Sequence, residues 1–358
     1  MPGEERFELD LHAQRVLFGA GRIDDVPDEV DALGMRQVML VATRSAKSAA
    51  DRISERLGSR VVARESEVVQ HVPAANVAST TQIAVETGAD GILTVGGGSA
   101  TGLGKAVAVQ TGLRLVAVPT TYAGSEATAV FGITGEQKRT GRDLRALPHV
   151  VIYDSELTTG MPQRLTATSG LNAMAHCVEA LYALGANPVT EALALEGVRR
   201  LAAALPVGVD SPGDLAARGG ALVGAYLAGL SMEQAGTALH HVLCHVIGGD
   251  YRVDHGDVHA VLLPYVAAYN SAAATGPLGL VASALSGSTD AASALRGLAE
   301  RLGAPTDLAS IGVPQDALDS TAERAVGAVG ERNPRRPDAP SLRRLLDDAY
   351  AGRPPGTY

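Results

Sequence analysis

The chain has 358 residues, of which 46% are hydrophobic and 19% charged, and its formal net charge is -9 at pH 7. This balance is typical of a folded protein that is long enough for two domains. The negative charge and the lack of a lysine- and arginine-rich stripe exclude nucleic acid as the expected partner. The acidic start of the chain and the lack of an uncharged apolar run of membrane-spanning length favour a cytoplasmic protein that binds no membrane. With only Cys177 and Cys244 present, we expect core packing and not disulfides to stabilise the fold.

Short apolar runs alternate with helical stretches in the first half of the chain. Segments with helical spacing, such as residues 46–58, separate these runs. The alternation predicts a parallel sheet. We predict strands at residues 15–19, 37–43, 60–65, 90–98, 113–121 and 149–154.

After about Glu156 the strand pattern ends, and long segments rich in alanine and leucine follow. Their spacing predicts helices at residues 168–185, 188–205 and 214–236. We therefore predict an α/β N-terminal dinucleotide-binding domain over residues 1–156 and an all-α C-terminal catalytic domain over residues 157–358. We expect the chemistry to take place in the cleft between them.

A glycine-rich turn, "GGGS", follows the predicted strand at residues 90–98. Gly97, Gly98 and Ser99 would place backbone N–H groups where a helix begins, which suits the pyrophosphate of a dinucleotide. The spacing matches neither the dinucleotide fingerprint nor a P-loop, so a simple tight turn is the alternative. A second polar turn, with Thr120 and Thr121 in "VPTTYAGSEAT", follows the next strand and favours a cofactor site.

Several motifs occur in an order that is more specific than any one of them. The chain resembles the iron-containing alcohol dehydrogenase superfamily, and within it the maleylacetate reductases. The resemblance implies the dehydroquinate synthase-like fold, an NADH or NADPH cofactor, hydride transfer and a homodimer. It runs over nearly the whole chain and is carried by "GGGS", "PTTYAGSE", "TSGLNAMAHCVEALYA", "ALHHVLCHVIGG", "HGDVHAVLLPYVAAYN" and "NPRRPDAPSLRRLLDDAYAG".

The resemblance also bears on whether the histidine-rich segment 237–260 holds a metal. In metal-dependent members one aspartate and three histidines bind the ion, and the matching positions here are Asn172, His176, His241 and His255. A neutral amide in place of the carboxylate supplies no charge to offset a divalent cation. We therefore predict no metal, as the maleylacetate reductase resemblance also implies. Asp254 and Asp257 are the residues that could replace the missing ligand.

The implied reaction reduces the carbon–carbon double bond of maleylacetate, a small dicarboxylate, to give 3-oxoadipate. Hydride addition pushes charge onto the ketone oxygen, and an imidazole can stabilise that oxygen and supply a proton. His241 and His245, four residues apart, share one helix face. We predict His245 as the proton donor, His241 and His255 as oxyanion-binding residues, and Asn172, His176 and Tyr122 as substrate-binding residues.

Other polar residues of these motifs have a plainer interpretation. A histidine on an apolar helix is usually a core residue, which we favour for His240 and His259. Buried thiols of Cys177 and Cys244 need no role, and Lys105 is equally compatible with the cleft and with the surface.

Cofactor choice depends on the end of the second predicted strand, which carries Thr43 and Arg44 instead of an acid. No acid repels a 2′-phosphate there, so we predict use of both NADH and NADPH. The predicted cofactor-binding residues are Gly97, Gly98, Ser99, Thr120, Thr121 and Thr43.

Two departures from the reductase pattern leave the substrate open. Val242 stands where a lysine is usual, and "DHGDVH" replaces "PHAETH". A related enone acid is therefore an alternative substrate. The other hypotheses are a metal-dependent alcohol dehydrogenase and a cofactor-binding protein without turnover.

Overall fold

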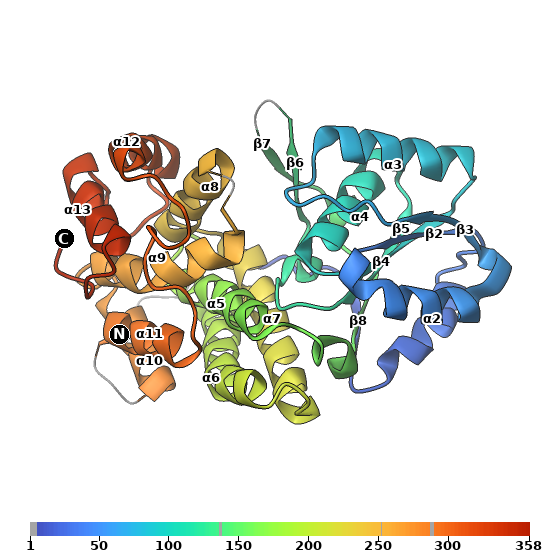
Figure 1. The fold of residues 1–358 in the computed structure, drawn as a ribbon, viewed down its shortest axis with the longest axis horizontal. Helices are drawn as coiled ribbons and strands as arrows, with labels where there is room; N and C mark the ends of the chain where they lie inside the picture. The colour runs from blue at the N-terminus through green and yellow to red at the C-terminus, as the bar shows by residue number, and fades with distance from the viewer. Residues whose placement is uncertain (1–5, 136–137, 252, 287–289) are drawn as a thin grey trace. The chain divides into compact units, whose positions relative to one another are not determined.

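The computed structural model describes residues 6–135, 138–251, 253–286 and 290–358 (Figure 1). They form two compact units. The sheet unit holds residues 12–161 and 211–229, and the helical unit holds the described residues of 1–11, 162–210 and 230–358. Our predicted domains, 1–156 and 157–358, are continuous in sequence, whereas residues 211–229 group with the sheet unit. This return of the chain has no marker in the sequence, because the segment looks like any other apolar helix.

The sheet unit contains a six-stranded sheet in the order β1-β8-β5-β4-β2-β3, and every neighbouring pair is parallel. Each of the six predicted strands is present, so the α/β prediction is confirmed. The strands are β1 (Arg15–Phe18), β2 (Val38–Ala42), β3 (Val61–Glu65), β4 (Gly91–Gly96), β5 (Arg114–Pro119) and β8 (Val150–Tyr153).

Helices cover both faces of this sheet (Figure 1). Along β2, Val38 and Leu40 join a core with α1 and α2, whereas Met39 and Val41 join a second core with α3 and α4. Successive side chains of a strand point to opposite faces, which explains why a strand buried on both faces is a continuous apolar run. The helices are α1 (Val26–Ala32), α2 (Lys47–Leu57), α3 (Ala74–Glu86) and α4 (Gly98–Thr111), with short 3-10 turns η1 (Arg22–Asp25), η2 (Arg44–Ala46), η3 (Gly58–Arg60), η4 (Ser125–Ala127), η5 (Leu144–Ala146) and η6 (Ser155–Thr158).

A small antiparallel hairpin in this unit was missed by our prediction. It consists of β6 (Val130–Thr134) and β7 (Lys138–Arg142). The side chains of β6 are all half-buried, so the segment lacks the continuous apolar run that marks the central strands.

The regular secondary structure of the second half is all helical in its described residues, as predicted. One core joins α8, α9, α12 and α13, and α5 packs against α6 and α9. The helices are α5 (Gln163–Ala180), α6 (Pro188–Asp210), α7 (Leu215–Ala235), α8 (Leu239–Tyr251), α9 (His255–Asn270), α10 (Thr275–Ser286), α11 (Ala291–Arg301), α12 (Leu318–Val329) and α13 (Ala339–Tyr350), with the 3-10 turn η7 (Gln315–Ala317).

Helices α5 and α9 are buried on nearly all sides over most of their length. A helix that is apolar all round belongs in a core, so a polar side chain on it must find a partner inside the protein. These are the helices that carry the polar residues of the candidate site.

Within the part of the chain that the structure describes, one helix, α7, is long and apolar enough to cross a membrane, with half of its most apolar stretch buried. Length and composition are weak evidence, because core helices meet the same criterion. Within the sheet unit, Gly229 of α7 packs against Gly124, where an added Cβ would come 2.4 Å from a backbone oxygen.

Candidate active site

Turns at the carboxyl ends of β2, β4 and β5 lie against one another in the sheet unit. The backbone N–H of Thr43 donates to Val95 O at 3.1 Å, and that of Thr120 donates to Gly96 O at 3.0 Å. Gly96 has a φ of 149°, and a Cβ added there would lie 2.8 Å from Thr43 Oγ1. Glycine is therefore required at this position by both backbone conformation and space.

Gly97 precedes α4, and Gly98 and Ser99 begin that helix. A Cβ added at Gly97 would lie 2.9 Å from Thr121 Cγ2, so the threonine of the neighbouring turn excludes larger residues. The first N–H groups of a helix have no intrahelical acceptor and favour an anion. The structure thus brings the predicted cofactor residues together, with a geometry that suits a pyrophosphate.

Lys105 has a structural position in α4. Its side chain is fully buried, and Nζ donates to Ser125 O at 2.6 Å, to Thr128 O at 2.8 Å and to Thr128 Oγ1 at 3.0 Å. These bonds tie α4 to the segment that follows the second polar turn. Nearby Glu126 is also buried, which raises the pKa of its carboxyl, and it accepts a hydrogen bond from the Tyr153 hydroxyl at 2.7 Å.

Tyr122, predicted to bind substrate, is fully buried in the sheet unit. Its hydroxyl accepts a hydrogen bond from Nη1 of Arg218, a fully buried cation on α7, at 3.0 Å. Arg218 Nε also donates to Pro212 O at 2.9 Å. The contacts place Tyr122 in the interior of its unit, and its role in substrate binding stays a prediction.

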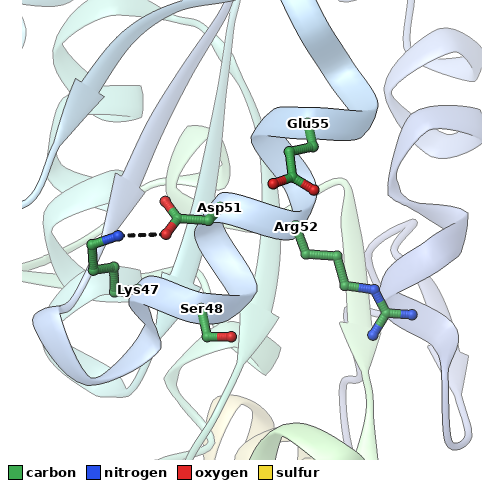
Figure 2. A pocket seen from close by; sticks show the side chains of 5 residues that line it. All are labelled: Lys47, Ser48, Asp51, Arg52 and Glu55. Carbon is green, nitrogen blue, oxygen red and sulfur yellow. Dashed lines mark hydrogen bonds and ion pairs between the residues drawn. The ribbon is translucent and has the colours of Figure 1, made fainter.

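A surface hollow of about 540 Å³ lies along α2 (Figure 2). Several charged side chains around it are already paired: Lys47 Nζ lies 2.5 Å from Asp51 Oδ2, and Asp51 also pairs with Arg64. The lysine and the arginine lower the pKa of Asp51. These are exposed pairs on a solvated helix face, so the hollow is no candidate for the chemistry. It is lined by Lys47, Ser48, Asp51, Arg52 and Glu55.

The helical unit gathers the predicted catalytic histidines into one group. The rings of His176 on α5 and His241 on α8 stack with centroids 4.9 Å apart. His245 stacks on His255 of α9 at 5.5 Å and lies 6.3 Å from His241. His241 and His245 share one face of α8, as predicted from their spacing. His245 is exposed, His255 is half-buried and the other two are buried.

Unpartnered polar atoms mark the buried part of this histidine group. Among the described residues, Asn172 Oδ1, His176 Nδ1 and His241 Nε2 are buried and have no hydrogen-bond partner. Asn172 precedes His176 by one turn of α5, so both share a helix face. Buried polar atoms are almost always paired in folded proteins, and exceptions indicate a ligand site.

Glu179 is a residue of this site that our sequence analysis missed. It is fully buried and accepts hydrogen bonds from the backbone N–H groups of Ala238 at 3.0 Å and His240 at 2.7 Å. Its Oε2 also lies 2.5 Å from His241 Nδ1. A carboxylate can only accept a hydrogen bond, so Nδ1 of His241 carries a proton. Nε2 of the same ring faces away from Glu179. The signal available in the sequence was the position of this acid, three residues after His176 on the same predicted helix.

His240 and His259 are fully buried, as expected of core residues, but they extend the histidine group. His240 Nε2 lies 2.9 Å from His259 Nδ1, and His259 Nε2 lies 3.0 Å from His255 Nε2. The three rings form a continuous hydrogen-bonded chain from the half-buried His255 to the interior. Burial, and then the neighbouring imidazoles, hold the pKa values of His176, His240 and His259 well below the usual range.

Val242 packs into the apolar core of the helical unit and not into the histidine group. It is 7% exposed and lies among the residues of α8, α9 and α12. The departure from lysine at this position therefore changes the core side of α8, whereas His241 and His245 keep their own face.

Comparison with known proteins places both halves of the chain in one family. Residues 13–155 match the family described as iron-containing alcohol dehydrogenase, and residues 166–350 match the Fe-containing alcohol dehydrogenase family, C-terminal. The chain belongs to the iron-containing alcohol dehydrogenase family. The observed fold, a parallel-sheet unit with a helical second half, is the fold of this family.

Curated relatives in this family carry the name maleylacetate reductase. The chain is 43% identical over 347 residues to the maleylacetate reductase of Burkholderia cepacia, covering 97% of this chain and 98% of the relative. It is 44% identical over 344 residues to maleylacetate reductase 2 of Cupriavidus pinatubonensis, covering 95% and 96%. The crystal structure of maleylacetate reductase from Agrobacterium tumefaciens superposes with a TM-score of 0.93 at 41% identity, covering 98% of this chain and 100% of that chain.

The family's name raises the question of whether these residues fit an iron ion. The position of the expected carboxylate is Asn172, and His255 has its Nε2 engaged by His259. The acids that could substitute have other partners: Asp257 pairs with Arg164 at 2.7 Å, and Asp254 caps α9 by accepting from Gly256 N. A divalent cation needs anionic or strong donors, and this set of neutral donors does not fit one.

A second group, His240, Cys244 and His259, has ligand atoms within 4.8 Å of one another. Burial raises the pKa of the Cys244 thiol well above its usual value, so the sulfur stays protonated. The 2.9 Å between the two histidine nitrogens is a hydrogen-bond distance, shorter than the roughly 3.3 Å between two ligands of a tetrahedral zinc ion. These residues form a hydrogen-bonded pair with a neighbouring thiol.

Proposed function

We propose that this protein is a metal-independent, NAD(P)H-dependent reductase that converts maleylacetate to 3-oxoadipate. The observation that carries the proposal is the set of buried, unpartnered atoms of Asn172, His176 and His241, in a group with no carboxylate at the family's metal position. The relatives named maleylacetate reductase support the substrate.

The reaction adds one hydride and one proton across a carbon–carbon double bond conjugated to a ketone. Hydride addition to the carbon far from the ketone moves an electron pair onto the ketone oxygen, giving an enolate. The enolate needs a hydrogen-bond donor, and then the carbon next to the ketone takes the proton. A bound nicotinamide would supply the hydride, so the protein must stabilise the oxyanion and deliver the proton.

Glu179 and His241 suit the first of these tasks. With Nδ1 of His241 committed to Glu179, protonation of Nε2 gives an imidazolium that the buried carboxylate stabilises. Its Nε2 proton would then be available to the ketone oxygen. This arrangement supplies positive charge to the developing oxyanion without a metal ion.

The other predicted roles follow the same arrangement and form part of the proposal. The exposed His245 is the proton donor, because contact with solvent allows it to be reprotonated after each turnover. His255 adds a second donor to the oxyanion. Asn172 and His176 contact the substrate from α5.

We also propose that the cofactor binds the sheet unit through the turns of Thr43, Gly97, Gly98, Ser99, Thr120 and Thr121. Both NADH and NADPH are accepted, because Arg44 follows Thr43 where an acid would exclude the 2′-phosphate. The arginine is exposed, so an anionic group can reach it, and it pairs with Glu67 at 2.8 Å.

We further propose that the protein holds no metal, forms a homodimer and is located in the cytoplasm. Two free buried thiols, Cys177 and Cys244, are compatible with a reducing compartment. Strand β1 forms one edge of the sheet, and an edge strand can pair with a second copy. Light scattering of the purified protein tests the assembly.

The deciding experiment follows NADH consumption by chelator-treated protein of measured metal content when maleylacetate is added. Rapid turnover without metal supports the proposal. Turnover that returns only with added iron or zinc would instead favour a metal-dependent dehydrogenase with Asp254 or Asp257 as the replacement ligand. NADPH binding without consumption of any enone acid would favour a cofactor-binding protein.

A further inference from the structure

His240 and His259 have no part in the function proposed above, yet their contacts lead directly to one of its residues. His259 uses both ring nitrogens, with Nδ1 at 2.9 Å from His240 Nε2 and Nε2 at 3.0 Å from His255 Nε2. Both rings are fully buried, whereas His255 is half-buried. The chain therefore connects the protein interior to a ring that faces the site.

Neutral imidazole has one N–H donor and one bare nitrogen acceptor. Burial lowers the pKa values of His240 and His259, so both rings are neutral near pH 7. A chain of neutral rings has only two consistent directions. Either every ring donates towards His255, or every ring donates away from it.

The interior end of the chain distinguishes these directions. His240 Nδ1 is buried and has no hydrogen-bond partner among the described residues. If the rings donate away from His255, this atom is a buried N–H without an acceptor. If they donate towards it, the atom is a bare nitrogen, and unpaired buried N–H groups are the rarer of the two cases. The favoured direction runs from His240 through His259 to His255.

We propose that His259, supported by His240, is a positioning residue that holds His255 in the tautomer with its proton on Nδ1. His259 Nε2–H donates to His255 Nε2, so Nδ1 of His255 becomes an obligatory donor. Nδ1 lies near Gly248 of α8, where an added Cβ would be 3.7 Å from it.

The inference rests on the proposed function for its catalytic consequence, but the tautomer can be measured without substrate. In histidine-labelled protein, nitrogen NMR should show His255 protonated on Nδ1 and bare on Nε2 near pH 7. In His259→Leu, which is apolar and suits the buried site, His255 should lose this single tautomer and give a mixture. An unchanged His255 tautomer in His259→Leu would overturn the proposal, whatever the substrate proves to be.

Turnover gives the second measurement. We expect kcat of His259→Leu to fall roughly 10- to 100-fold, with KM for the substrate changed less than threefold, since positioning partners of active-site histidines have effects of this order. His259→Gln places an amide nitrogen near the position of Nε2 and should restore kcat to within about fivefold of the wild type. His259→Gln as inactive as His259→Leu would count against the tautomer, because the amide keeps the donor.

Control variants separate positioning from folding. His240→Leu should act in the same direction as His259→Leu but more weakly, because His259 still contacts His255. His149→Gln removes an exposed histidine of the sheet unit and should leave kcat and the His255 tautomer unchanged. If wild-type protein consumes no NADH with maleylacetate, the proposed function fails, while the NMR result still decides the tautomer.

Discussion

Each unit of this protein contains a buried polar network, and the two networks differ in how completely their atoms are paired. In the sheet unit, the buried ammonium of Lys105 has three close oxygen acceptors, and buried Glu126 accepts from Tyr153. In the helical unit, Asn172, His176 and His241 each leave a buried atom without a partner. Buried polar groups are costly unless paired. The paired network therefore has the character of a structural clamp, and the unpaired one that of a ligand site.

The largest expected effect follows from removing the unpartnered nitrogen of His241. In His241→Asn the side-chain amide can still donate to Glu179, but no group replaces Nε2. We expect kcat to fall roughly 10²- to 10⁴-fold, the usual range for an acid–base group, with little change in thermal stability. Steady-state kinetics with a melting curve tests this. A kcat within threefold of the wild type would mean that the unpaired atoms have no part in catalysis.

The converse is expected of Lys105. Lys105→Met removes a buried cation and leaves the oxygens of Ser125 and Thr128 without their donor. Breaking such a buried arrangement costs about 3–5 kcal/mol of unfolding free energy. Urea unfolding measures the loss. Lys47→Met, which breaks the exposed pair with Asp51, is the matched control and should lower the free energy of unfolding far less. Equal losses in the two variants would remove the distinction between clamp and surface pair.

The comparison also explains which parts of the structure were predictable from sequence. Strands such as β2 and β4 are buried on both faces, so each is a continuous apolar run in the sequence. These runs allowed the six-stranded sheet to be predicted. The β6–β7 hairpin is half-buried and has no such pattern. The return of residues 211–229 to the sheet unit depends on packing between distant segments, for which local sequence holds no information.

The same limit applies to the site. His241 and His245 could be placed on one helix face from their spacing alone. The contact of Glu179 with His241 joins α5 to α8, and the contact of His259 with His240 joins α9 to α8. Only the tertiary structure shows these two contacts. The residues proposed to contact the substrate were therefore easier to identify from sequence than the residues proposed to orient them.

Acid should weaken the helical unit through its buried histidines. Their pKa values are lowered in the folded protein, so below the unfolded value of about 6.5 the unfolded chain binds protons that the folded chain does not. Their contribution to the free energy of unfolding is complete above about pH 6.5, and it declines as the pH falls towards the pKa values of these histidines in the folded protein. Each should contribute about 1.4 kcal/mol per pH unit in that range.

Urea unfolding between pH 7 and pH 5 measures how steeply the free energy of unfolding falls with pH. His259→Gln removes one of these histidines and should reduce this slope by the contribution of one histidine. An unchanged slope in that variant would mean that His259 is not held neutral in the folded state. Lys47→Met, which changes an exposed ion pair and no histidine, should leave the slope as it is.

The smallest expected effect concerns cofactor choice at the surface of the sheet unit. Arg44 pairs with Glu67, and both side chains are largely exposed, 80% and 70%. Because the acid competes with a 2′-phosphate for the guanidinium, Glu67→Gln should lower KM for NADPH by roughly 3- to 10-fold, about 0.6–1.4 kcal/mol, and leave KM for NADH within twofold. Arg44→Gln should shift selectivity in the opposite direction.

Asp51→Asn, which changes another acid near the start of α2, should alter neither KM value. Added salt should diminish the effect of Glu67→Gln, because the contact between Arg44 and Glu67 is exposed. Parallel changes in KM for both cofactors would show that Arg44 does not contact the 2′-phosphate, and that selectivity is set by Thr43 and the backbone of the turn.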